Sequence, residues 1–160
     1  MPRLSISTLY GFFLKQSFST ILDTCGIQSM KMEDSLYPTL THLLKSLLDR
    51  QRTALVFLPG KAEISEVALL LKKGGVETRA IVLFHGELEF DQLEKAKIPT
   101  RYPRIVLATS KAETSLTLAD ADFVIDLGLS RGIEKTDDLL EIQTFAAPAS
   151  NREQRRGRVL

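Results

Sequence analysis

The sequence predicts an α/β domain built around a mostly parallel sheet. Short continuous apolar runs recur through the middle of the chain and alternate with segments of helical periodicity. Buried parallel strands have such continuous apolar runs because helices cover both faces of the sheet. Gly and Pro residues follow several of these runs and separate the elements. We therefore expect three layers, helix–sheet–helix, with a β-hairpin near the C-terminus.

Composition limits the classes of function. With 21 Lys and Arg against 20 Asp and Glu in 160 residues, the net charge of +1 indicates neither a basic nucleic-acid-binding chain nor an acidic tail. Any anion site must therefore be local. The single cysteine, Cys25, cannot form an intrachain disulfide, which favours a reducing compartment, the cytoplasm or the nucleus. No apolar run is long enough for a membrane span, so we expect no membrane contact.

Residues 1–50 are expected to form a helical segment packed on the domain. Apolar spacing near the start suits a helix that Gly26 would end. Residues 36–48, LYPTLTHLLKSLL, carry leucines three and four positions apart, which is typical of an amphipathic helix. Pro38 is tolerated in the first turn of that helix.

The middle of the chain carries the alternation of strands and helices. The first apolar run, TALVFL, ends at Pro59 and Gly60, and the helix after it ends at Gly74 and Gly75. We expect strands at residues 53–58, 79–84, 104–109 and 121–126, and helices at residues 61–73 and 89–96.

After the last strand, residues 127–145 have β character and predict a hairpin that turns near residues 136–138. A final helix is expected from Asn151, with Ser150 or Asn151 as its cap. Two histidines and one cysteine cannot supply a tetrahedral zinc site, so we expect no metal site. His85 is expected to be structural. No glycine-rich phosphate loop is present.

The polar residues that follow the strands indicate where a ligand binds. Open α/β sheets bind ligands at the carboxyl ends of their strands. Gly60 follows the first strand, and Thr109, Ser110 and Ser115 lie at and after the third. Their amides and hydroxyls can donate to phosphate oxygens, and the arginines of residues 153–158 add planar cationic groups. The sequence therefore predicts a phosphate-binding edge.

At these residues the sequence resembles the second RecA-like lobe of superfamily 2 helicases, and among them the DEAH/RHA group of RNA helicases. The segment TALVFLPGKAEI resembles motif IV, RIVLATSKAETSLTLADADFVID resembles motif V and the strand that follows it, and QRRGR resembles the start of motif VI. The resemblance implies a RecA-like fold for residues 51–160, a lobe truncated within motif VI. Leu160 stands where the family has glycine.

The resemblance implies that ATP binds between two lobes. The first, absent lobe would supply the phosphate loop and the carboxylates that hold Mg²⁺, and the second would supply arginine fingers. Arg158 would be the first finger, with Arg155 and Gln154 supporting contacts to nucleotide and to the other lobe. The isolated chain is then expected to be inactive as an NTP hydrolase.

The family also implies nucleotide contacts at the end of motif V. Thr117 resembles the residue that senses nucleotide. Two residues later the family usually has Asp, whereas this chain has Ala119 with Asp120 beside it. Asp120 is therefore the expected nucleotide-binding carboxylate.

RNA is the implied partner of the remaining motif residues. Contacts to its phosphates carry no base information, so binding should be independent of sequence and sensitive to salt. Ser110 stands where family members often have Asn. The implied RNA-binding residues are Gly60, Thr109, Ser110 and Ser115, and Glu113 and Thr114 would couple nucleotide state to RNA grip.

The hypothesis is thus the second motor lobe of an ATP-dependent RNA helicase, an enzyme part whose partners are RNA, the first lobe and C-terminal accessory domains. The isolated chain is expected to be monomeric. One alternative is a viral superfamily 2 helicase of flavivirus or potyvirus kind, because QRRGRV also resembles their motif VI. Another is a degenerate lobe that binds RNA or protein without ATP turnover, which Ala119 suggests.

Overall fold

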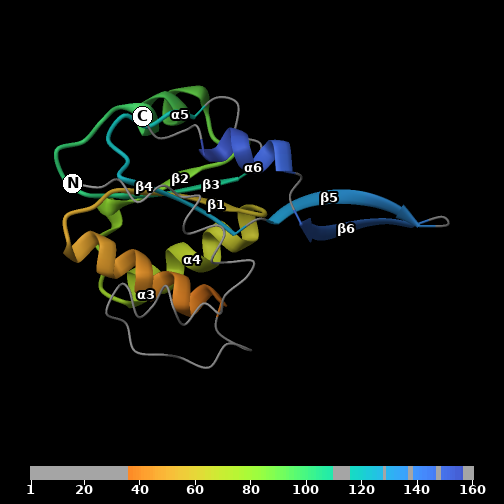
Figure 1. The fold of residues 1–160 in the computed structure, drawn as a ribbon, viewed down its shortest axis with the longest axis horizontal. Coiled ribbons are helices and arrows are strands. Elements are labelled where there is room, and N and C mark those ends of the chain that lie inside the picture. The colour runs from red at the N-terminus through yellow and green to blue at the C-terminus, as the bar shows by residue number, and fades with distance from the viewer. Residues whose placement is uncertain (1–35, 110–115, 128, 137–138, 147–148, 157–160) are drawn as a thin grey trace.

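A four-stranded parallel sheet forms the middle layer of the computed structural model (Figure 1). The strands lie in the order β2-β3-β1-β4, so that β1 and β3 are central and β2 and β4 are at the edges. The strands are β1 (Ala54–Leu58), β2 (Ile81–Phe84), β3 (Ile105–Thr109) and β4 (Phe123–Asp126). The structure describes residues 36–109, 116–127, 129–136, 139–146 and 149–156.

The register of the sheet aligns one row of side chains near the carboxyl ends of the strands. Phe84 of β2 pairs with Ala108 of β3, and Ala108 pairs with Phe57 of β1. Phe57 in turn pairs with Asp126 of β4. Register partners in a parallel sheet point to the same face, so these four residues lie on one face. A carboxylate therefore ends a row that is otherwise apolar.

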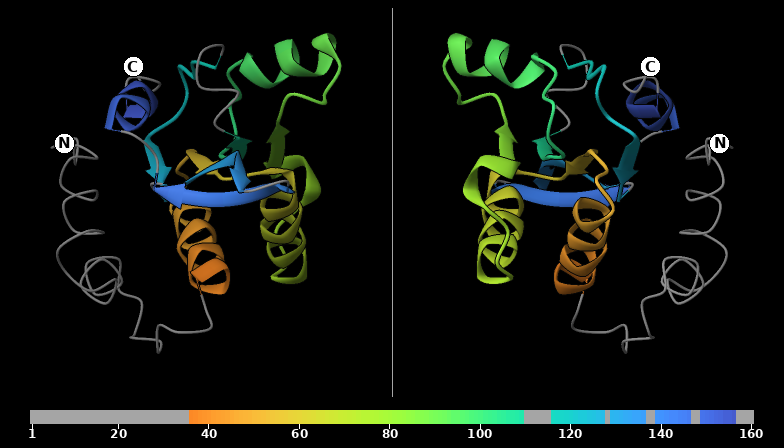
Figure 2. Two further views of the ribbon diagram at one scale, coloured as in Figure 1. Left: turned by 90° about the vertical axis from the view of Figure 1, so that its right-hand side faces the viewer. Right: turned by 90° about the vertical axis from the view of Figure 1, so that its left-hand side faces the viewer.

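Helices α3 (Leu36–Asp49) and α4 (Lys61–Lys73) cover the opposite face of the sheet (Figure 2). Leucines three and four positions apart line the inner side of α3, as an amphipathic helix requires. All five residues of β1 are buried, because β1 is covered on both faces. The main members of this core are Leu40, Leu44, Leu47, Val56, Ile64, Leu71, Leu107 and Ile125.

The face that carries Phe57 is covered by α5 (Phe90–Lys97), by residues 116–121 and by α6 (Ala149–Arg156) (Figure 2). Residues between β3 and β4 must return from the carboxyl end of β3 to the amino end of β4, because the two strands are parallel. On the way, Leu116 and Leu118 are fully buried in the second apolar core. That core also contains Leu55, Phe57, Phe84, Val106, Ala108 and Val124.

The antiparallel hairpin of β5 (Leu129–Thr136) and β6 (Leu139–Ala146) projects from the body of the domain (Figure 1). It lies between β4 and α6 in the chain, so it leaves and rejoins the domain at the carboxyl edge of the sheet. The predicted α/β class, the parallel sheet and the C-terminal hairpin are confirmed.

Several element boundaries differ from the predictions by one or two residues, and the strand expected from residue 121 begins at Phe123. The strand expected from residue 79 begins at Ile81, because the 3₁₀ turn η1 (Thr78–Ala80) precedes it. The expectation that α6 begins at Asn151 is wrong, since its first residue is Ala149. Ala has the highest helix propensity and here follows a proline, which outweighs the capping preference of Ser150 and Asn151.

The predicted helix over residues 61–73 is confirmed at both ends. The helix expected to end at Gly26 lies outside the described residues. In the described ranges, every helix is too short or too polar to cross a bilayer.

Candidate functional site

The four parallel strands end at one edge of the sheet, the carboxyl edge, on the right of the body in Figure 1. One register step beyond the row of Phe57 and Asp126 come Thr109 of β3 and His85 after β2. Gly60 follows β1, whose last residue pairs with Thr109. Neighbouring strands are about 4.8 Å apart, so the ends of β1 and β3 lie side by side. Gly60, two residues beyond β1, and Thr109, the last residue of β3, are therefore both at the carboxyl edge of the sheet.

Gly60 joins β1 to the start of α4. It is buried, its backbone is extended with φ −161° and ψ 178°, and its carbonyl accepts a hydrogen bond of 3.1 Å from the amide of Ile64. Glycine has no side chain to cap the helix, so amides of the first turn of α4 receive no side-chain acceptor from it. Such a helix start is suited to an anion. Next to it, Lys61 forms an ion pair with Glu87 of the loop after β2.

His85 was expected to be structural, and the structure adds a reason to examine it as a ligand contact. The residue is 8% exposed, and its Nδ1 is buried without a hydrogen-bond partner among the described residues. Buried polar atoms are normally hydrogen-bonded, so an orphan nitrogen at the edge where ligands bind is unusual. A histidine directly after a strand is the sequence signal that could have found it.

Arg155 anchors α6 against the sheet. Its guanidinium Nη1 donates to Oδ1 of Asp126 at 2.7 Å, and its Cζ lies 5.4 Å from the ring centre of Phe57. The side chains of Arg155 and Asp126 are 1% and 2% exposed. Arginine suits this place because a planar guanidinium can bind a carboxylate while lying over an aromatic ring. The preceding residue, Gln154, is exposed.

Gln154 and Arg155, which were predicted to act together, lie in different surroundings. The structure places both residues on α6 at the carboxyl edge, but only Gln154 faces solvent. The guanidinium of Arg155 is buried in the domain against Asp126. The contact of Arg155 with nucleotide stays a prediction, and the contact that the structure shows is with the sheet.

Asp120 lies at the opposite, amino edge of the sheet. Its carboxylate accepts from Nε and Nη2 of Arg104 at 2.9 Å each, and from the amide of Thr100 at 3.2 Å. Burial raises the pKa of Asp120, but the hydrogen bonds and charge of Arg104 and the Thr100 bond outweigh burial, and the pKa stays below its ordinary value. The structure therefore does not bring Asp120 to the predicted group at the carboxyl edge.

The other expected nucleotide contact, Thr117, is exposed between the buried Leu116 and Leu118. Ala119 is exposed as well, so the position where the family usually has Asp faces solvent. Because Asp120 is turned toward Arg104, its carboxylate does not replace the one missing at Ala119.

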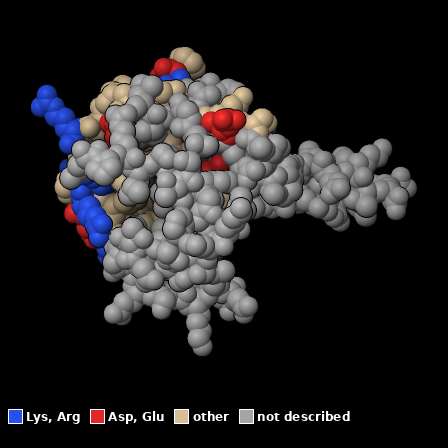
Figure 3. Space-filling model, in the orientation of Figure 1, with Lys and Arg blue, Asp and Glu red and all other residues tan. Residues whose placement is uncertain are grey.

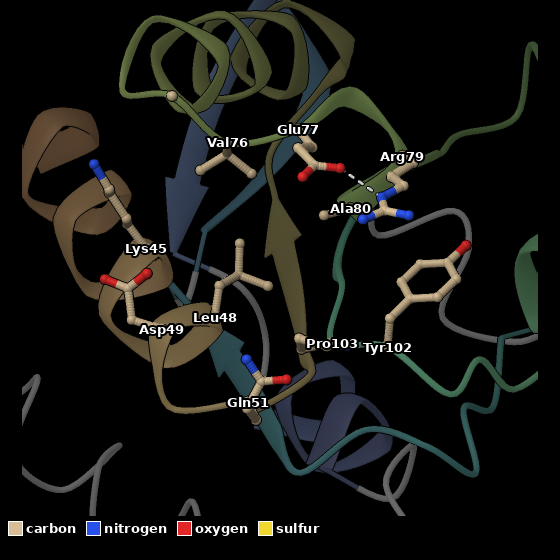
Figure 4. A pocket seen from close by; sticks show the side chains of 11 residues that line it. Lys45, Leu48, Asp49, Gln51, Val76, Glu77, Arg79, Ala80, Tyr102 and Pro103 are labelled. Atoms are coloured by element: carbon tan, nitrogen blue, oxygen red, sulfur yellow. Dashed lines mark ion pairs between the residues drawn. The ribbon is translucent and has the colours of Figure 1, made fainter.

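A hollow of about 340 Å³ opens at the amino edge, where Arg79 lies over the ring of Tyr102 at 5.7 Å and pairs with Glu77 (Figure 4). The space-filling view shows Lys and Arg gathered along the same margin of the molecule (Figure 3). None of the predicted site residues lines this hollow. Its lining also includes Lys45, Leu48, Asp49, Gln51, Val76 and Pro103.

Several predicted residues lie outside the described residues: Ser110, Glu113, Thr114, Ser115 and Arg158. A buried residue lies on each side of residues 110–115 of motif V. Thr109 is 8% exposed and Leu116 is fully buried, so the segment between them starts and ends on the domain. In the described ranges, no three His, Cys, Asp or Glu side chains form a group that could hold a metal ion.

Comparison with known proteins places this arrangement in a family. The helicase conserved C-terminal domain family matches residues 37–160. The ATP-dependent RNA helicase HrpA homolog of Haemophilus influenzae is 38% identical over 77 residues, which are 48% of this chain and 6% of that protein. Human ATP-dependent RNA helicase DHX29 is 34% identical over 138 residues, 79% of this chain and 10% of that protein.

Solved structures agree with the sequence comparison. The crystal structure of the Escherichia coli DExH-box NTPase HrpB is similar with a TM-score of 0.65 and 26% identity, over 81% of this chain and 17% of that chain. A second structure, of the E. coli DEAH/RHA helicase HrpB, gives a TM-score of 0.61 and 27% identity. This chain therefore spans a small part of the length of its relatives. It belongs to the helicase conserved C-terminal domain family, in the DEAH/RHA type of RNA helicases.

Proposed function

We propose that this chain is the second motor lobe of an ATP-dependent RNA helicase, in which it supplies an arginine finger and grips the RNA backbone. One observation carries the proposal. The helix that begins motif VI is fixed by Arg155 and Asp126 at the same sheet edge where motifs IV and V end. Three motifs far apart in the sequence thus reach one surface. The relatives named as ATP-dependent RNA helicases support the choice of ligands.

Nucleotide would lie between this edge and a first lobe. Arg158 would approach the γ-phosphate and stabilise the charge that develops in the transition state. Gln154, exposed on α6, and Thr117, exposed near the end of motif V, are available for nucleotide or lobe contacts. Chemistry therefore needs both lobes, and we expect the isolated chain to fold without hydrolysing ATP.

RNA would bind along the loops of motifs IV and V. The helix start after Gly60 and the hydroxyl of Thr109 suit phosphate oxygens. The hydroxyls of Ser110 and Ser115 would be further donors. His85, with its orphan nitrogen, lies beside Thr109 and adds a further contact. Glu113 and Thr114 lie between the ends of motif V and would couple nucleotide state to RNA grip.

Magnesium accompanies ATP in such enzymes and would supply charge neutralisation at the phosphates. The described part of this chain has no group of three His, Cys, Asp or Glu side chains that could hold the ion, and the first lobe would supply its ligands. The first lobe, RNA and C-terminal accessory domains are the proposed partners. The proposed location is the cytoplasm or nucleus, and the proposed state of the isolated chain is monomeric.

The decisive experiment measures RNA-stimulated ATP hydrolysis by the intact protein that contains this chain, with Arg158 present and as Arg158→Ala. An arginine finger contributes about 10³-fold or more to turnover. We expect that loss in kcat with nucleotide binding largely kept. Arg101→Ala, an exposed arginine at the amino edge, is the matched control and should retain full turnover.

Unchanged turnover in Arg158→Ala would remove the finger assignment. Absence of ATP hydrolysis in the intact protein would point instead to the alternative of a binding module without turnover. Hydrolysis by the purified chain alone, in proportion to its concentration, would contradict the assignment as one lobe of two.

A further inference from the structure

Arg155 makes a buried charged contact between α6 and the domain. The helix has the sequence ASNREQRR, in which Ala149 is the only apolar residue. An eight-residue helix is marginal by itself and usually relies on an apolar face packed on a core. Among the described side chains of α6, Ser150, Glu153 and Gln154 are exposed and Arg155 is buried. A buried arginine thus stands where such a helix usually has an apolar side chain.

The Arg155–Asp126 contact connects the motif VI helix with β4, the strand that follows motif V. Asp126 ends β4, the strand that follows the motif V segment, while Arg155 lies in the motif VI helix. Phe57, the register partner of Asp126, lies under the guanidinium on the neighbouring strand. The guanidinium is thus held from two directions, by the carboxylate at 2.7 Å and by the ring at 5.4 Å. Such a contact fixes orientation as well as distance.

The distance in sequence from this contact to the proposed finger is short. Arg158 follows Arg155 by three residues, and three residues of chain span about 11 Å at most. A reacting group that is misplaced by about 1 Å can lose roughly 100-fold in rate. The place where Arg155 is held therefore limits where the Arg158 side chain can reach.

We propose that Arg155 is a positioning residue: its buried contact with Asp126 and Phe57 sets the place of α6, and through α6 the reach of Arg158. The inference rests on the proposed function, because it needs Arg158 to act on ATP. It assigns to Arg155 a role without nucleotide contact. Lysine at this position keeps the charge but lacks the planar group, so it tests placement rather than charge.

The test compares ATP hydrolysis by the intact protein in four forms: unchanged, Arg155→Lys, Arg158→Ala and the double variant. We expect Arg155→Lys to lower kcat by roughly 10- to 100-fold and to change the KM for ATP by less than about threefold. In the double variant, turnover should equal that of Arg158→Ala alone, because a misplaced finger and an absent finger are equivalent.

Arg104→Lys is the matched control, since Arg104 also forms a buried ion pair with an Asp but lies at the amino edge. Measured at a temperature where circular dichroism shows every variant folded, it should keep kcat within about twofold. Should Arg155→Lys fail to fold, a replacement variant that combines Arg155→Met with Asp126→Leu exchanges the ion pair for apolar side chains, which is often tolerated. That variant should fold and still show the loss in kcat.

Three results would overturn the inference alone while Arg158→Ala still collapses turnover. These are losses that multiply in the double variant, a raised KM for ATP with kcat kept, and an equal loss of kcat in Arg104→Lys. Full turnover of Arg158→Ala would overturn the proposed function, and the positioning role with it.

Discussion

Arg104 and Asp120 form a two-point ion pair at the amino edge of the sheet, with both nitrogen–oxygen distances at 2.9 Å. The third nitrogen of Arg104 donates to the carbonyl of Ala96 at 2.9 Å, so one side chain joins α5 to the segment before β4. Arg104 is 2% exposed. A second Arg–Asp pair, Arg155 with Asp126, is buried at the carboxyl edge, so the described residues show such a pair at both edges of the sheet.

Replacing Arg104 by Met should destabilise the fold. The substitution leaves the carboxylate of Asp120 largely buried without its guanidinium, which typically costs about 3 kcal/mol. Denaturant unfolding of the purified chain measures the change. Arg101→Met, an exposed position three residues earlier, should shift the free energy of unfolding by less than about 0.5 kcal/mol. Equal changes in the free energy of unfolding at the two positions would show that the Arg104–Asp120 pair does not contribute to stability.

Asp120 should also make the stability of the fold depend on pH. Its pKa is lower in the folded state than its ordinary value of 3.8, because Arg104 and Thr100 outweigh the effect of burial. The contribution is therefore fully present at neutral pH and is lost as the pH falls below about 4 and through the folded pKa.

Asp120→Asn tests this dependence by denaturant unfolding at pH 7 and at pH 3. We expect the variant to be less stable than the unchanged chain at pH 7, with a smaller loss between the two values. Parallel losses in the two proteins would rule out Asp120 as a source of the acid sensitivity.

Gly60→Ala should weaken RNA binding without disturbing the fold. The φ of −161° is extended backbone that any residue adopts, so alanine adds no strain. A methyl group would separate the helix start from an RNA phosphate, and we expect roughly tenfold weaker binding in fluorescence anisotropy. Gly74→Ala, at the far end of α4, is the control, since its Cβ would make only ordinary contacts. Unchanged affinity in Gly60→Ala would remove this glycine from the RNA path.

The sequence allowed the fold class and most elements to be predicted, because both depend on local patterns. Apolar runs and Gly residues mark β1 and α4, and the helix was confirmed at both ends. The choice of partner for a charged side chain depends on tertiary contact instead. Arg155 has its carboxylate 29 residues earlier in the chain, so QRRGR alone does not show which arginine turns inward.

The sequence contains one indication of the Arg155–Asp126 pair. The run FVID ends in a carboxylate on a strand whose other residues are apolar, and a buried Asp requires a cation. Asp120 and Asp122 stand near each other in the sequence, yet Asp120 meets Arg104 and Asp122 meets Arg52. Only the crossing of the chain over the sheet decides which carboxylate reaches which arginine.

The 29-residue separation of Asp126 and Arg155 has a consequence for biosynthesis. Translation adds about 5–20 residues per second, so Arg155 is made roughly 1–6 s after Asp126. By the end of that interval the strands of the sheet and the hairpin have been synthesised, whereas the guanidinium that pairs with Asp126 has only just been added. The contact between α6 and β4 through this pair can therefore form only after residue 155 has been synthesised, later than the strands of the sheet and the hairpin.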